Sequence, residues 1–299
     1  MEPEGPPRTG ANPGIVPVIF SDQRTKHGTM GLRVNTNIAS ITAQRNLGNV
    51  SGRLQGNYSR LASGLRIATA ADDAAGLAIS ERLRSQIRSF GVTARNAQDG
   101  ISLVQTAEGA LAEVSNQLGR LRELAIQSAN GTLSASDRQT LDSEYQAIIS
   151  EIDRVAGETN FNGVQLLNDT TALDIQVGIA SGEVIQVTPV DVTTSTATLG
   201  NILDPAAASG ELSVIDTAID AVNIARGDLG AAQNRLQSAF ASIQNVRENL
   251  SAAESRIRDV DVAAETADLT RNTILQQAAT SVLSQANTQP QIALSLLQG

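Results

Sequence analysis

The sequence has no cysteine and no tryptophan, and aromatic residues make up only 2% of its 299 positions. Without cysteine, disulfide bonds and thiolate metal sites are excluded. From Met30 onward the chain also has no lysine and no histidine, so Ser–His and Cys–His nucleophile pairs and His-based zinc helices cannot form there. The segment Gly227-Asp-Leu-Gly230 lacks the Lys and Ser/Thr of a phosphate-binding loop. We therefore predict a protein that is not an enzyme and has no catalytic, cofactor-binding or metal site.

Two further features limit the partners. The sequence has no run of roughly 18 or more apolar residues, so we expect no membrane-spanning helix and no membrane partner. The formal net charge is −9, which argues against nucleic acid as a partner. The apolar residues are mainly Leu, Ile, Val and Ala, which suit helix-on-helix packing.

A heptad pattern is the strongest feature that the sequence does have. From residue 215 to residue 260, every third or fourth residue is apolar, and the steps of three and four alternate. This pattern indicates one continuous helix, about 70 Å long at roughly 1.5 Å per residue, that needs a partner helix. We predict an assembly seam along it, formed by Leu229, Leu236, Ile243, Leu250 and Ile257.

The partner helix is expected in the same chain. Residues 83–125 repeat the apolar rhythm, and Asn130-Gly131 is a suitable stop. A third helix is expected to begin near Ser136, where Gln139 three residues later completes a capping box.

A weaker helix precedes the others, and glycines interrupt it at a cost of about 1 kcal/mol each relative to Ala. Its apolar stripe comprises Ile38, Ile41, Leu47, Val50, Leu54, Tyr58, Leu61 and Leu65. Such a stripe is too sparse to stabilise an isolated helix. We therefore expect this helix to depend on other chains.

The middle of the chain is different. Leu173, Ile175 and Val177 alternate with polar residues, and residues 180–182 form a plausible hairpin turn. Together these patterns predict a mainly α fold: a long antiparallel helical rod or coiled-coil bundle, formed by the N- and C-terminal arms, with a small β-hairpin region in the middle.

The chain is expected to divide into six segments. Residues 1–29 hold five of the eight prolines and the only lysine and histidine, so we expect the native chain to start at Met30; the alternative is a disordered leader that the mature protein removes or ignores. The further segments are a 30–75 terminal segment, a 76–160 helical arm, a 161–206 β-rich connection, a 207–261 helical arm and a 262–299 terminal segment.

Charged residues allow two interpretations. Asp72-Asp73 is the most conspicuous carboxylate pair, and we interpret it as a helix start, where the helix dipole favours negative charge. Arginines recur along both long helices among glutamates. They either keep the surface soluble or form complementary ion pairs between stacked rods, for which Arg is better suited than Lys.

Several strings carry a family resemblance. They read GLRVNTNIASITAQRNL (31–47), LASGLRIATAADDAAGLA (61–78), LRELAIQSANG (121–131), EIDRVAGETNFNGV (151–164), GAAQNRLQSA (230–239), ENLSAAESRIRDVD (248–261) and ILQQAATSVLSQANTQPQIALSLL (274–297). In these strings, and in their order, the chain resembles bacterial flagellin over essentially all of residues 30–299.

The resemblance implies a structural subunit that polymerises into the extracellular flagellar filament for swimming motility. The terminal segments 30–75 and 262–299 would fold together on assembly and line the filament core. The implied partners are further copies of the chain, an export chaperone that binds the C-terminal segment, and filament cap and hook-junction proteins. The subunit would be exported through the flagellar secretion channel.

The resemblance also implies recognition by the flagellin-sensing Toll-like receptor of hosts. The family's contacting residues fall on Arg120, Leu124 and Glu144, and all three residue types are kept. Gly119 departs from the Gln that the family commonly has there. On spacing alone, Leu124 could instead belong to the helix core, with Arg120 merely solvated.

Two alternatives remain at this stage. A coiled-coil adaptor would explain the heptads but not the matching strings, and another flagellar axial protein, such as a hook–filament junction protein, would share the helical arms.

Overall fold

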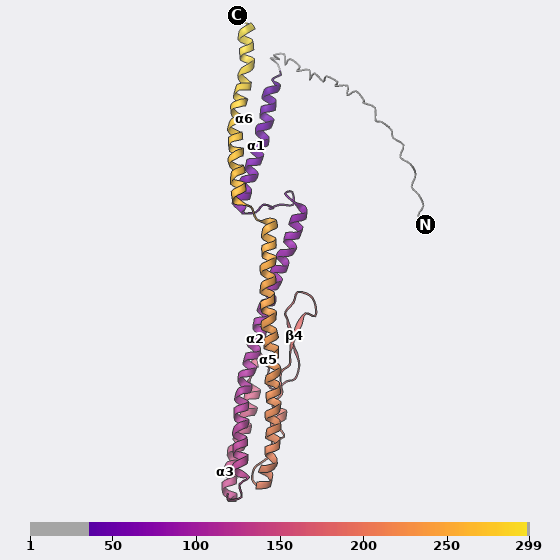
Figure 1. Cartoon of the computed structure of the whole chain (residues 1–299), viewed down its shortest axis with the longest axis vertical. Helices are drawn as coiled ribbons and strands as arrows, with labels where there is room; N and C mark the ends of the chain where they lie inside the picture. The colour runs from indigo at the N-terminus through magenta and orange to yellow at the C-terminus, as the bar shows by residue number, and fades with distance from the viewer. Residues whose placement is uncertain (1–35, 298–299) are drawn as a thin grey trace, which may run out of the picture. The chain divides into compact units, whose positions relative to one another are not determined.

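The structure of this chain is a computed structural model that describes residues 36–297 (Figure 1). The predicted leader, residues 1–29, lies outside them. The described chain forms two compact units: residues 56–268, and residues 36–55 together with residues 269–297. Within the described range, no helix combines the length and the apolarity that a membrane span requires.

Two long helices build the larger unit. Helices α2 (Ala74–Ser128) and α5 (Pro205–Arg258) contain 55 and 54 residues and lie antiparallel, side by side (Figure 1). Helix α3 (Ala135–Glu158) folds back against α2. Their apolar stripes meet in one core, which runs from Ile101 to Ala125 on α2 and from Ala208 to Leu236 on α5. The predicted mainly α, long-helical fold is therefore confirmed.

The start of α2 confirms the interpretation of the acidic pair. Asp73 has an extended backbone, and its carboxylate accepts a hydrogen bond from the Gly76 backbone N–H at 2.9 Å. Asp72 does not cap the helix; it accepts from the backbone N–H groups of Ala68 and Thr69 in the preceding loop. Both carboxylates therefore satisfy backbone donors near a helix start.

The turn between α2 and α3 differs from the prediction. The capping box is formed by Ser134 and Asp137, not by Ser136 and Gln139, because the Asp137 carboxylate reaches back to the Ser134 N–H at 3.1 Å. Gly131 is not the stop of α2 either: the helix ends at Ser128, and the C-cap residue Ala129 keeps a right-handed backbone.

The connection contains two small antiparallel strand pairs. Strands β1 (Asn160–Phe161) and β2 (Val164–Gln165) flank a turn in which Asn162 and Gly163 have positive φ. Strands β3 (Leu173–Gln176) and β4 (Val184–Val187) pair in the register Leu173↔Val187 to Gln176↔Val184. Gly182 has a φ of 87° in the predicted turn, which favours glycine. A short helix, α4 (Thr193–Thr196), follows.

The β3–β4 hairpin packs on the long helices. Strand β3 contacts α2, and β4 contacts α5. Ile185 and Val187 are buried in the common core, and the Asn96 side chain donates to the Gln176 carbonyl at 3.1 Å. The hairpin thus covers one stretch of the α2–α5 pair.

The terminal helices are α1 (Ile38–Ser63) and α6 (Val262–Leu297). The predicted stripe of α1 is wrong at three positions: Ile38, Ile41 and Tyr58 are 50%, 57% and 58% exposed. The buried positions of α1 include Ser40 and Asn57 instead. A search for apolar periodicity cannot identify such a face, because part of it is polar.

Candidate assembly and recognition surfaces

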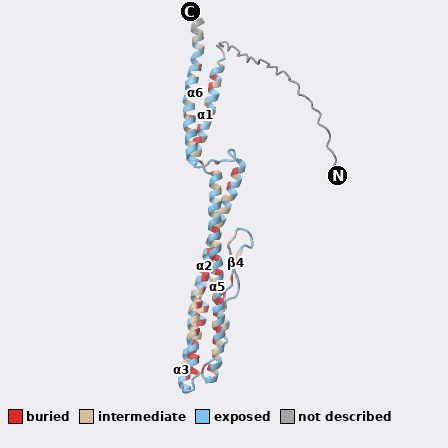
Figure 2. Cartoon of the chain, in the orientation of Figure 1, coloured by how far each residue is buried: buried red, intermediate tan, exposed pale blue. Residues whose placement is uncertain are grey.

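The predicted assembly seam on α5 has a buried part and a half-exposed part (Figure 2). Leu229, Leu236 and Ile243 are 3%, 0% and 5% exposed, whereas Leu250 and Ile257 are only half-buried. The change follows from the neighbouring elements. The shared core that includes α3 and β4 ends near Leu236 on α5.

Beyond that core, α2 and α5 leave an open surface that mixes partly exposed apolar side chains with polar ones. Val246 is 37% exposed, and Leu83, Ile87 and Phe90 on α2 are half-buried. A groove of about 530 Å³ lies here, lined by Ile87, Gln244, Arg247, Glu248, Ser251, Ala252 and Ser255. This part of the helix pair can still bury apolar area against another element.

Apolar side chains are also exposed on the terminal helices. Besides Ile38 and Ile41 on α1, Ile274 and Val282 on α6 are 60% and 59% exposed. Full burial of one such side chain is worth about 1.5–3 kcal/mol. The exposed faces of α1 and α6 are therefore candidate contact surfaces.

The ends of the long helices are joined by an extended crossing. The Val260 N–H donates to the Gly64 carbonyl at 3.0 Å, and the Arg66 N–H donates to the Arg258 carbonyl at 2.6 Å. The Arg258 guanidinium, 12% exposed, pairs with Glu81 on α2 at 2.7 Å. This crossing ties residues that are far apart in the sequence into one unit.

The predicted receptor patch is only partly at the surface. Arg120 on α2 and Glu144 on α3 are about half exposed, and the guanidinium contacts the Glu144 carboxylate at 2.8 Å. Arg120 also pairs with Glu123 at 2.9 Å. The hydrogen bond to the Glu144 carboxylate, and to a lesser degree the one to Glu123, raise the pKa of the Arg120 guanidinium above its usual value.

Leu124 has a different environment from the other two patch residues. Its side chain is 0% exposed and belongs to the core cluster. A buried side chain cannot contact a receptor in this conformation, so the surface of the patch consists of Arg120 and Glu144.

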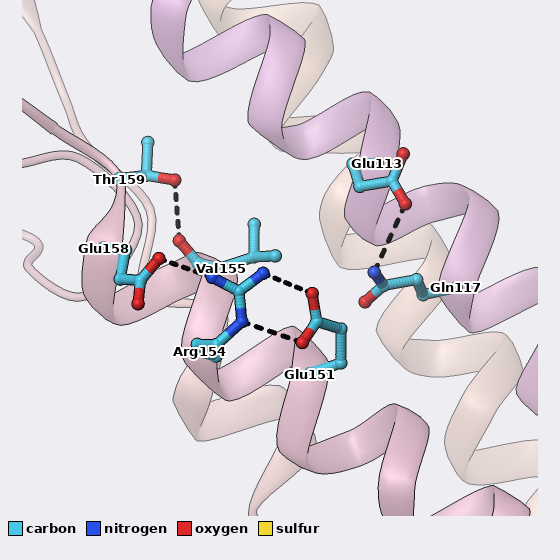
Figure 3. Close-up of polar contacts among 7 residues, drawn as sticks. All are labelled: Glu113, Gln117, Glu151, Arg154, Val155, Glu158 and Thr159. Carbon is cyan, nitrogen blue, oxygen red and sulfur yellow. Dashed lines mark hydrogen bonds and ion pairs between the residues drawn. The ribbon is translucent and has the colours of Figure 1, made fainter.

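The arginines divide into two groups. Arg154 pairs with Glu151 and Glu158 along the exposed face of α3 (Figure 3), which is a solvated arrangement within one helix. Arg122 instead joins α2 to α5 through Asp216 at 2.7 Å. Arg122 therefore stabilises the subunit itself, and ion pairs between stacked rods stay a prediction.

Sequence reasoning missed Arg138, which is 8% exposed. Its guanidinium donates to the Ser128 carbonyl at 3.0 Å and to the Asn130 carbonyl at 2.9 Å. These bonds hold the turn between α2 and α3. No sequence signal distinguished this arginine from the solvated ones on the same helix.

A long helix pair with an uncovered apolar stripe is typical of a rod-shaped structural subunit. Comparison with known families agrees. Residues 34–172 match the bacterial flagellin N-terminal helical region, and residues 212–297 match the bacterial flagellin C-terminal helical region. The chain therefore belongs to the bacterial flagellin family, whose members are subunits of the flagellar filament.

Individual relatives are similar over most of their length. A flagellin of Halalkalibacterium halodurans is 47% identical over 270 residues, covering 89% of this chain and 99% of the relative. A flagellin of Bacillus subtilis is 40% identical, covering 89% and 100%. A solved flagellar hook-associated protein from Vibrio parahaemolyticus has a TM-score of 0.55 at 15% identity, covering 63% of this chain and 100% of that one. That likeness concerns the fold alone.

Proposed function

We propose that this chain forms an extracellular filament that drives swimming, and that its subunits join through the apolar surfaces that the folded chain leaves exposed. The carrying observation is the exposure of Ile38, Ile41, Ile274 and Val282 on the terminal helices. Together with the open end of the α2–α5 pair, they offer surface that a second copy can bury. Membership of the flagellin family supports a second copy of the chain as the partner that binds there.

Assembly of the purified full chain tests the proposal. Ile41→Asn and Ile274→Asn should each raise the critical concentration for filament formation about tenfold or more, because each loses more than 1.4 kcal/mol of burial per contact. Sedimentation and negative-stain microscopy measure this. The matched control is Ile179→Asn in the hairpin loop, where the side chain is 45% exposed. Unchanged assembly of both terminal variants would contradict the proposal.

Membership of the flagellin family also supports proposals for export and for the filament ends. The C-terminal segment, residues 262–299, is proposed to bind an export chaperone on its way through the flagellar secretion channel, with α6 offering Ile274 and Val282 as apolar anchors. Filament cap and hook-junction proteins are the proposed partners at the filament ends. Chaperone binding, measured by calorimetry, should weaken in Val282→Asn and stay unchanged in Ile179→Asn.

A second proposed function is recognition by the flagellin-sensing Toll-like receptor. It is supported by the juxtaposition of Arg120 and Glu144 across two helices at 2.8 Å. Exposed ion pairs contribute little to stability, so a receptor can compete for either partner. Arginine is a frequent anchor in interfaces.

Reporter-cell activation by soluble chain tests this second proposal. Arg120→Ala and Glu144→Ala should both reduce potency, with circular dichroism confirming an intact fold. Arg154→Ala is the control, because this residue is equally exposed on α3 and its two ion pairs lie within that helix. If the wild-type chain and the three variants activated the receptor equally, Arg120 and Glu144 would not form the receptor contact.

A further inference from the structure

The terminal helices pair through heptad seams that contain polar residues. The least exposed residues of α1 follow one another at alternating steps of three and four: Ser40, Ala43, Leu47, Val50, Leu54, Asn57 and Leu61. The corresponding face of α6 contains Glu265, Leu269, Asn272, Gln276, Ala279, Leu283 and Ala286. Small and polar residues alternate with few large apolar ones, so apolar packing alone specifies the register of this pair weakly.

One polar cluster lies where α1 ends and α6 begins, inside the unit of residues 56–268. The Glu265 carboxylate accepts from the Asn57 amide at 2.6 Å and from the Arg60 guanidinium at 2.9 Å. Asn57 is 2% exposed, and the Glu265 side chain is 12% exposed. A carboxylate this deeply buried is tolerated only where such donors face it.

A second cluster lies in the unit formed by residues 36–55 and 269–297. The Asn37 amide donates to the Ala286 carbonyl at 2.7 Å. The Ser40 hydroxyl, in a residue only 7% exposed, donates to the Asn287 side-chain oxygen at 2.7 Å. Asn37 also accepts from the Ser40 backbone N–H, so the same residue caps α1 and contacts α6.

The two clusters share one antiparallel register. Asn57 follows Asn37 by 20 residues, and Glu265 precedes Ala286 by 21 residues. A slip of one heptad would move Glu265 away from both of its donors. Buried polar side chains in a heptad seam specify register in this way, at a cost in stability.

We propose that the cluster of Glu265, Asn57 and Arg60 is a register-determining site for the terminal helices. The crossing of residues 64–67 with residues 257–260 holds the start of α6 beside the end of α1, so this cluster can form within the larger unit. It then serves as the nucleus from which the terminal segments pair, because the first turn is the unfavourable step in helix formation. The inference rests on the proposed assembly function, since the register decides which faces of α1 and α6 remain for neighbouring subunits.

Engineered disulfides report the register directly, because the chain has no cysteine of its own. The full chain with Ser40→Cys and Asn287→Cys reports the observed register. The full chain with Ser40→Cys and Thr280→Cys reports a slip of one heptad. Each pair is combined with Glu265→Ala, with Glu265→Gln, with the exchange of Arg60→Glu and Glu265→Arg, or with the control Glu113→Ala, which lies exposed on α2.

Glu265→Ala should reduce 40–287 crosslinking at least fivefold and increase the 40–280 product. Glu265→Gln, which keeps an acceptor for Asn57, and the charge exchange should both recover most of the 40–287 product. Equal 40–287 crosslinking in Glu265→Ala and Glu113→Ala would overturn the register role, whether or not the chains sediment as filaments. Failure of the assembly proposal is a separate result: it would show as unchanged sedimentation of both Ile41→Asn and Ile274→Asn.

Discussion

At the residue scale, two glycines of one helix have opposite requirements. Gly119 has no atom within 4 Å of an added Cβ, whereas a Cβ at Gly100 would lie 3.2 Å from Ile175 Cγ2 and 3.3 Å from the Leu236 methyl groups. Both glycines sit inside α2. The first glycine only weakens the helix; the second permits the close approach of β3 and α5.

These two glycines therefore predict stability changes of opposite sign. Gly119→Ala should raise the free energy of unfolding by about 0.5–1 kcal/mol, from helix propensity alone. Gly100→Ala should lower it by about 1–3 kcal/mol, because the added methyl overpacks the core. Urea denaturation followed by circular dichroism measures both. A stabilised Gly100→Ala chain would show that Ile175 and Leu236 can move aside.

Tyr145 predicts a pH effect. Burial is the main reason that the pKa of the Tyr145 hydroxyl lies above its usual value, and the nearby Glu211 carboxylate raises it further. The buried, neutral hydroxyl therefore contributes stability to the folded chain. This contribution is fully present below the unfolded-state pKa of about 10 and is lost as the pH rises through the raised folded-state pKa.

A Tyr58→Phe chain isolates this group, because the sequence has two tyrosines. Its phenolate absorbance should stay low above pH of about 10 and rise only together with unfolding by circular dichroism. Normal titration in the folded state would mean that Tyr145 is accessible to water.

At the element scale, the heptad seam of α5 is one sequence pattern with two environments. Leu236 is 0% exposed, whereas Val246, further along the same stripe, is 37% exposed. The difference arises because the core shared with α3 and β4 ends near Leu236. The seam therefore stabilises the folded subunit at one end and remains available for contacts at the other.

Charge placed at these two positions should have unequal effects. Leu236→Asp buries an unpaired carboxylate and should cost several kcal/mol, enough to abolish cooperative thermal unfolding measured by circular dichroism. Val246→Asp should leave the melting curve of the soluble chain nearly unchanged while reducing filament formation. Similar melting curves for both variants would mean that the seam register is wrong.

At the scale of the whole molecule, the chain holds one well-buried core and one sparsely buried helix pair. The unit of residues 56–268 contains the core and the crossing near Gly64. In the same unit, Asn57 and Arg60 at the end of α1 contact Glu265 at the start of α6. The terminal helices outside it expose Ile41, Ile274 and Val282.

A fragment of residues 56–268 should therefore stay folded, helical and monomeric, whereas the full chain forms filaments. The physical reason is that the fragment keeps every core contact but loses the exposed terminal faces. Circular dichroism and analytical ultracentrifugation measure this. If the fragment polymerised as readily as the full chain, the terminal helices would be dispensable for assembly.

The sequence by itself determined the two long helices, their apolar periodicity and the family. Heptad steps, the aspartate pair before α2 and the glycine in the β3–β4 turn act locally, so they can be identified without knowing what packs against them. The tertiary structure decided which parts of each stripe are buried, because burial depends on the element opposite. For this reason Leu124 belongs to the core, Val246 stays open, and Glu265 packs between α1 and α6, where apolar periodicity gave no indication of a polar seam.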